Sequence, residues 1–122
     1  KNNILITCLP GPTPFVPALV MSGLPSDSFI FEGFLPRKKG RKSKLYEISQ
    51  NTKTTILYES PFRIIKTLSD MKQTIGSDRK IAIVREISKI YEEVFRGTIE
   101  EAILEYNERT IKGEFVICID KA

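Results

Sequence analysis

Histidine is absent from all 122 residues of the sequence. No imidazole can therefore act as a general acid or base, and metal sites that depend on histidine ligands are excluded. No apolar run is long enough to cross a bilayer. The apolar stretch at 4–9 is also too short for the core of a signal peptide, and it ends in Pro10-Gly11-Pro12. We expect no metal, no membrane span and no secretory leader.

Cysteine is scarce as well, since only Cys8 and Cys118 are present. Each lies in an apolar, strand-like run. Two such residues are more typical of buried thiols in a reducing compartment than of a disulfide or a metal site. We therefore expect a cytoplasmic protein.

The length allows one domain with one hydrophobic core. The apolar fraction of 41% and the charged fraction of 28% are those of an ordinary soluble domain. The sequence begins at a strand without a methionine. We expect residues 1–122 to be a single domain excised from a longer protein.

Positive charge is concentrated in one run, Arg37-Lys38-Lys39-Gly40-Arg41-Lys42-Ser43-Lys44 (below, the basic run). It holds six cations in eight residues and no acid. The whole chain has 19 basic and 15 acidic residues, a net charge of +4, so the rest has 13 against 15, a net charge of −2. Such a run favours contact with the phosphates of a nucleic acid. A solvated, mobile loop that keeps the protein soluble explains it equally well.

Hydrophobic periodicity predicts about six strands and four helices in mixed order. The strands are expected at 4–9, 29–35, 54–58, 80–85, 91–96 and 115–119. The helices are expected at 13–22, around Leu45 and Ile48, at 61–75 and at 98–106. The two strands at 80–96 read as a hairpin, and Thr98 to Glu101 as a capping box. The fold class is α/β (α+β), a two-layer sandwich with a mixed, partly antiparallel sheet.

Two strand-to-helix turns place polar groups where a ligand could bind. Pro10-Gly11-Pro12-Thr13 offers backbone N–H groups at a helix N-terminus, unless it is only a stiff turn. In Tyr58-Glu59-Ser60-Pro61-Phe62-Arg63 we expect Ser60 at the N-cap and Arg63 at N3. Arg63 then either pairs with Glu59 or meets a phosphate or carboxylate.

Other charged groups need no function. Arg85-Glu86 faces Tyr91-Glu92-Glu93 across the hairpin, as opposite charges often do. Lys112-Gly113-Glu114 is a charged turn before the last strand. None of these groups forms a metal site or a hydrolytic triad.

Taken in order, these motifs resemble the C-terminal half of the tetrapyrrole methylase-like (class III) methyltransferases, in the subfamily that modifies ribosomal RNA of the small subunit. The resemblance covers essentially the whole chain. It is carried by Leu9-Pro10-Gly11-Pro12, Gly23-Leu24-Pro25-Ser26-Asp27, Glu32-Gly33-Phe34-Leu35-Pro36 with the basic run, Tyr58-Glu59-Ser60-Pro61, Arg85-Glu86-Ile87-Ser88-Lys89 and Lys112-Gly113-Glu114. The chain departs from the family at Pro14, where a small residue is usual, and at Phe62, where histidine is usual.

The resemblance implies transfer of a methyl group from S-adenosylmethionine to a ribose 2′-hydroxyl of 16S ribosomal RNA. It implies the C-terminal domain of a two-domain tetrapyrrole methylase fold, with the cofactor in the cleft between the domains, and a homodimer. The Gly-Thr-Pro and Ser-Asp-Pro-Gly signatures of the family's N-terminal domain are not in this sequence. The chain would then be one wall of the active site.

The resemblance also implies roles for individual residues. Glu59 and Glu86 are the candidates on this wall for the group that accepts or polarises the proton of the 2′-hydroxyl. Contacts with the cofactor are implied for Pro10, Gly11, Pro12, Tyr58, Glu59, Gly113 and Glu114. Contacts with RNA are implied for Arg37, Lys38, Lys39, Arg41, Lys42, Lys44 and Arg63.

Two other functions remain open from the sequence. One is half of a methyltransferase that acts on a tetrapyrrole, against which the basic run argues. The other is a non-catalytic RNA-binding module, against which the Gly-Thr-Pro signature in the upstream sequence of the parent gene would argue.

Overall fold

The structure is a computed structural model that describes residues 22–24, 27–88, 91–107 and 113–122. The predicted strand at 4–9, the turn Pro10 to Thr13 and all but the last residue of the predicted helix at 13–22 lie outside the described residues.

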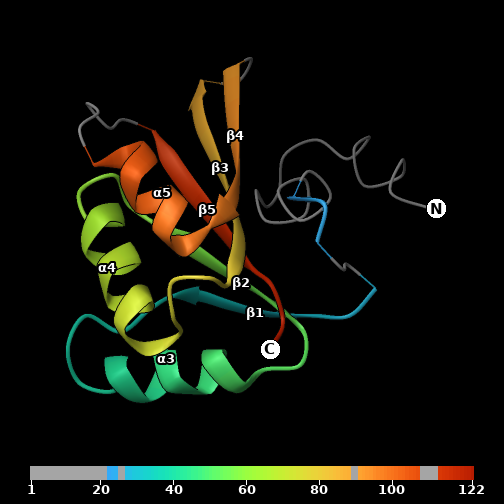
Figure 1. Cartoon of the computed structure of the whole chain (residues 1–122). Coiled ribbons are helices and arrows are strands. Elements are labelled where there is room, and N and C mark those ends of the chain that lie inside the picture. The colour runs from blue at the N-terminus through green and yellow to red at the C-terminus, as the bar shows by residue number, and fades with distance from the viewer. Residues whose placement is uncertain (1–21, 25–26, 89–90, 108–112) are drawn as a thin grey trace.

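Five strands and three helices make up the described part of the chain (Figure 1). In chain order they are β1 (Phe29–Phe34), α3 (Arg41–Gln50), β2 (Thr54–Glu59), α4 (Ile64–Thr74), β3 (Lys80–Ser88), β4 (Tyr91–Thr98), α5 (Ile99–Tyr106) and β5 (Glu114–Ile119). None of the described helices is long and apolar enough to cross a membrane.

The strands form one mixed sheet in the order β1-β2-β5-β3-β4. β1 runs parallel to β2, whereas β5 is antiparallel to both β2 and β3. β3 and β4 form the predicted antiparallel hairpin. The three helices lie together on one side of the sheet (Figure 1). The predicted α/β class with a mixed, partly antiparallel sheet is confirmed.

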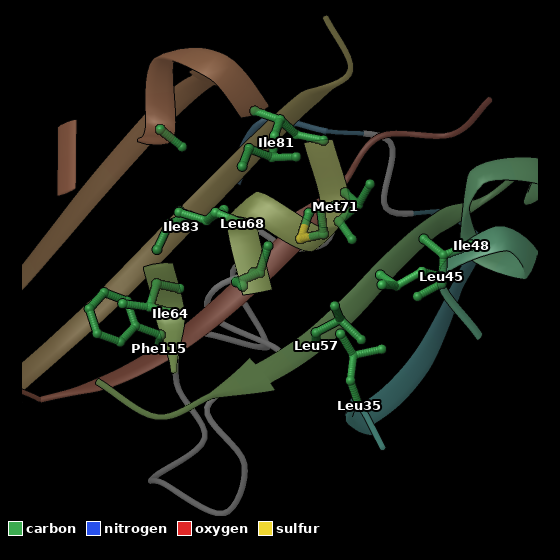
Figure 2. Close-up of a cluster of buried hydrophobic side chains, with 14 of the residues drawn as sticks. Leu35, Leu45, Ile48, Leu57, Ile64, Leu68, Met71, Ile81, Ile83 and Phe115 are labelled. Carbon is green, nitrogen blue, oxygen red and sulfur yellow. The ribbon is translucent and has the colours of Figure 1, made fainter. Parts of the chain in front are cut away.

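The main core fills the space between these helices and the sheet (Figure 2). The predicted apolar face of α4 is confirmed, because Ile64, Leu68 and Met71 are fully buried and Ile65 and Ile75 pack against the same cluster. A second, smaller cluster covers the other face of the central strands. It consists of Ile56, Ala82, Val84, Val116 and Cys118, with Leu24, Tyr58 and Val94 packed against it.

The helix start predicted at Ser60 is wrong. α4 begins at Ile64 with Arg63 at its N-cap, and the Arg63 side chain forms no capping hydrogen bond. The Ser60 N–H instead donates to Glu59 Oε1 at 2.8 Å, and the Ser60 carbonyl accepts from the Arg63 N–H in a separate turn. By contrast, the capping box at Thr98 and Glu101 opens α5 as predicted.

A buried guanidinium anchors the basic run to the rest of the fold. Arg41 Nε donates to Asp70 Oδ2, Nη2 donates to Thr67 Oγ1 and Nη1 donates to the Pro36 carbonyl, each at 2.9 Å. Only 6% of Arg41 is exposed. Gly40, at the N-cap of α3, adopts φ +84°, a left-handed conformation that suits glycine. One side chain thus ties the loop, the start of α3 and the middle of α4 together.

Replacing Arg41 by alanine should therefore destabilise the domain. The change removes all three hydrogen bonds of the guanidinium and leaves Asp70 with only the exposed Lys66 as an ion-pair partner, so we expect a loss of about 2–4 kcal/mol in the free energy of unfolding. Urea unfolding of Arg41→Ala beside Lys42→Ala measures it. Lys42 is the exposed neighbour on the same helix, and its replacement should change stability by no more than about 0.5 kcal/mol. Equal effects of the two changes would contradict the anchoring role.

Burial of Cys118 predicts a loss of stability in alkali. Desolvation raises the pKa of its thiol to about 12, against a smaller lowering by a hydrogen bond with Ser22. An unfolded thiol ionises near pH 8.5, so above that pH only the unfolded chain loses this proton. The free energy of unfolding is therefore unaffected by this thiol below pH 8.5. Above that pH it falls by about 1.4 kcal/mol per pH unit, which amounts to about 2 kcal/mol by pH 10. Unfolding of wild type and Cys118→Ala between pH 7 and 10 should show a steeper decline for wild type, and parallel curves would refute the prediction.

Candidate functional site

The register of the sheet brings several of the predicted segments to the end of the sheet where β1 and β2 finish and β5 begins. We call this end the strand-end edge. Glu59, the last residue of β2, pairs with Phe115 of β5, so Gly113 and Glu114 lie just beyond the end of β2. Because β1 is parallel to β2, its last residue Phe34 pairs with Tyr58 at the same edge. The turns at 58–60 and 113–114 therefore share one end of the molecule. Pro10, Gly11 and Pro12 lie outside the described residues.

Neighbouring residues at this edge serve opposite faces of the sheet. Tyr58 packs against the cluster on the face opposite α3, α4 and α5, and strand alternation puts Glu114 on that face too, because Val116 and Cys118 belong to the same cluster. Glu59 lies on the helix face, where its carboxylate reaches Thr67 of α4. The set of residues implied for cofactor contact is thus divided between two surfaces.

The carboxylate of Glu59 is fully used inside the domain. Its Oε1 accepts from the Ser60 N–H at 2.8 Å, its Oε2 accepts from the Thr67 hydroxyl, and only 4% of the side chain is exposed. Arg63 Nε lies 3.8 Å from Oε1. The ion pair that the sequence left as an alternative for Arg63 is therefore present, and Glu59 fastens the turn after β2 to α4.

Glu86 was the other candidate for a catalytic carboxylate. Its backbone pairs with Glu114 of β5 and Glu92 of β4, which places the residue at the strand-end edge. The Glu86 side chain is outside the described part of the structure. Its neighbour Arg85 is buried and donates to Glu93 Oε1 at 3.1 Å, directly across the hairpin, so this pair has the structural role that opposite charges often have.

The basic run divides into two groups. Arg41 is buried as described above, which argues against the contact with RNA predicted for it. Lys44 bridges Glu32 at 3.1 Å and Glu47 at 3.3 Å, and the bond to Glu32 in particular raises the pKa of Lys44. Arg37, Lys38, Lys39 and Lys42 are exposed. Within the described part of the chain no acidic side chain pairs with these four, so they carry the positive charge that faces solvent.

Two shallow depressions flank the run. One of about 290 Å³ lies between α3 and α4 and is lined by Lys38, Arg41, Lys42, Leu45, Lys66, Asp70, Gln73 and Thr74. The second, of about 270 Å³, which we call the strand-end groove, is lined by Phe34, Leu35, Arg37, Glu59, Ser60 and Arg63.

Sequence reasoning missed Lys66, which is well exposed and 3.5 Å from Asp70. The sequence indicated only that Lys66 lies on the polar side of a predicted helix. It did not indicate that Lys66 lies close to the basic run.

Comparison with protein families gives a direct match. The model of the tetrapyrrole (corrin/porphyrin) methylases matches residues 1–103. A relative from Halalkalibacterium halodurans, named ribosomal RNA small subunit methyltransferase I, is 46% identical over 98% of this chain and 42% of its own length. A relative of the same name from Synechocystis is 42% identical over 98% of this chain and 43% of its own length. The chain therefore spans little more than two fifths of these relatives.

Solved structures show the same fold at low sequence identity. The cobalt precorrin-4 methyltransferase CbiF superposes with a TM-score of 0.66 and 15% identity, over 92% of this chain and 50% of that enzyme. Uroporphyrin-III C-methyltransferase from Thermus thermophilus, in complex with S-adenyl homocysteine, superposes with a TM-score of 0.54 and 19% identity, over 90% of this chain and 50% of that one. The chain belongs to the tetrapyrrole (corrin/porphyrin) methylase family.

Proposed function

We propose that the chain is the C-terminal half of an S-adenosylmethionine-dependent methyltransferase that methylates a ribose 2′-hydroxyl of 16S ribosomal RNA. The observation that carries the proposal is the group of four exposed, uncompensated cations that follows β1, of which Arg37 lines the strand-end groove together with Glu59 and Ser60. The relatives named as ribosomal RNA methyltransferases support the same substrate. By the resemblance, the whole protein is a homodimer in the cytoplasm.

The side of the strand-end edge opposite α3, α4 and α5 suits the cofactor. Gly113 has φ +93°, a conformation that favours glycine and lets a ligand approach the backbone closely. Tyr58 and Glu114 flank it from the adjacent strands, and Pro10, Gly11 and Pro12 complete the proposed set. S-adenosylmethionine would supply a methyl group already activated on a sulfonium. The protein then has mainly to place the attacking oxygen in line with that group.

The two candidate carboxylates receive different roles in this proposal. Glu59 positions the turn, because both of its oxygens are held by Ser60 and Thr67. Polarisation of the 2′-hydroxyl is assigned to Glu86, whose backbone lies at the same edge opposite Glu114. The assignment predicts that Glu59→Gln lowers both the free energy of unfolding and the rate of methyl transfer. Glu86→Gln should lower only the rate of methyl transfer.

The RNA surface consists of the exposed members of the basic run together with Lys66 across the first depression. Arg63 adds a guanidinium at the strand-end groove. A tetrapyrrole methyltransferase remains the second candidate because solved enzymes of this fold act on such compounds. A row of cations on the outer surface is better matched to a polyanion than to a small molecule held in a cleft.

The salt dependence of RNA binding tests this surface. In the full-length parent protein, the triple change Arg37→Gln, Lys38→Gln and Lys39→Gln should reduce the slope of log K against log salt by about 2, since each lost phosphate contact with single-stranded RNA removes about 0.7. The matched control is the triple change Lys53→Gln, Lys80→Gln and Lys121→Gln, which removes three exposed cations at the opposite end of the sheet. The same drop in slope for both variants would show that net charge, and not this surface, determines binding.

Catalysis should require the missing half. We expect the purified 122-residue chain to transfer no labelled methyl group from S-adenosylmethionine to small ribosomal subunits, because it supplies only one wall of the cofactor cleft. The full-length parent protein should transfer it. Turnover by the 122-residue chain would contradict this prediction, and an inactive parent that still binds RNA would favour the non-catalytic module.

A further inference from the structure

Phe34 is a large aromatic side chain held at the surface by a well-packed backbone. It is 65% exposed, although the next residue, Leu35, is buried in the main core. Its ring meets the ring of Tyr58 edge-on, with centroids 5.6 Å apart and planes at 65°. The fold therefore fixes Phe34 in an exposed position, where its ring is available for a further contact.

Two arginines lie close to Phe34. The strand-end groove that it lines is also lined by Arg37 and by Arg63, whose Nε lies 3.8 Å from Glu59 Oε1, whereas no acidic side chain of the described residues pairs with Arg37. Phe62, which is 95% exposed, lies in the turn between the lining residues Ser60 and Arg63. Isolated exposed aromatics are common on protein surfaces. Here one exposed aromatic ring and two arginines line a single depression, and Arg37 belongs to the basic run.

We infer that the strand-end groove binds an unpaired nucleotide of the RNA, with its base stacked on Phe34 and its phosphate held by Arg37. This inference rests on the proposed function and adds that the substrate is recognised in a single-stranded segment. An A-form duplex hides the faces of its bases, whereas loops and single strands present them to aromatic side chains and arginine planes.

The location agrees with this role. Phe34 contacts Tyr58, which belongs to the proposed cofactor wall, and lines the same groove as Arg37, which belongs to the basic run. A nucleotide stacked there would lie between the methyl donor and the cations that hold the RNA backbone. A protein partner is a weaker match, because lysine is depleted from protein interfaces and the same run exposes Lys38, Lys39 and Lys42.

Binding of a short unstructured RNA to the full-length parent protein tests the inference. Phe34→Ala should weaken binding about 5- to 100-fold, the usual effect of losing one stacked base. The slope against salt should stay the same, because no charge is removed. Phe34→Tyr should keep the affinity and Phe34→Leu should lose most of it. Binding of the same sequence as a duplex should be unaffected by all three changes.

The control is Tyr46→Ala, which removes an equally exposed aromatic from α3 that lines neither depression. It should leave binding unchanged. A second readout uses RNA with 2-aminopurine in place of one base, since stacking quenches its fluorescence. Quenching by the wild-type protein should be absent with Phe34→Ala, while thermal unfolding of the variant stays that of the wild type.

The outcomes separate this inference from the proposed function. If Phe34→Ala binds single-stranded RNA normally while the Arg37, Lys38 and Lys39 variant shows the reduced salt slope, the RNA surface stands and the stacking site is refuted. If neither variant alters RNA binding, both proposals fail. If Phe34→Ala changes the oligomeric state in sedimentation and leaves RNA binding intact, the surface is a protein interface and the inference is overturned.

Discussion

The guanidinium of Arg41 is the interaction on which the arrangement of the site depends. Its three hydrogen bonds reach the loop after β1 and two positions on α4. A buried cation is expensive unless every donor direction is satisfied, so the geometry of its partners is closely constrained. Thr67 also donates to Glu59, and the same network therefore extends to the turn after β2. The proposed RNA surface and the strand-end edge are held in fixed relation by one set of buried polar contacts.

This network also explains why the charge pattern of the sequence was only partly informative. A run of six cations predicts a polyanion surface, but the sequence does not tell which cations face inward. Arg41 is buried because its partners come from α4, 26 and 29 residues away in the chain. Lys66 joins the surface for the same reason, since α3 and α4 pack side by side. Both facts are tertiary, and local sequence carries no trace of them.

Features governed by local rules were predicted well. The apolar face of α4 follows from helical spacing, the β3–β4 hairpin from two short runs with a polar turn, and the start of α5 from its capping box. The start of α4 was missed because Ser60 donates its backbone N–H to Glu59 and forms a separate turn instead of capping the helix. Strand alternation was visible in the sequence, yet treating Tyr58-Glu59 as one motif hid the fact that the two side chains serve opposite faces.

The bond between Arg41 and the Pro36 carbonyl closes a small ring of backbone and side chain around residues 37–40. Leu35 fixes one end of this ring in the core, and α3 fixes the other. Arg37, Lys38 and Lys39 inside it are exposed and can therefore change without disturbing the sheet, whereas Gly40 is fixed by its left-handed conformation. Substitutions in this enclosed segment can therefore alter the proposed affinity for nucleic acid while the strands that form the proposed cofactor wall keep their positions.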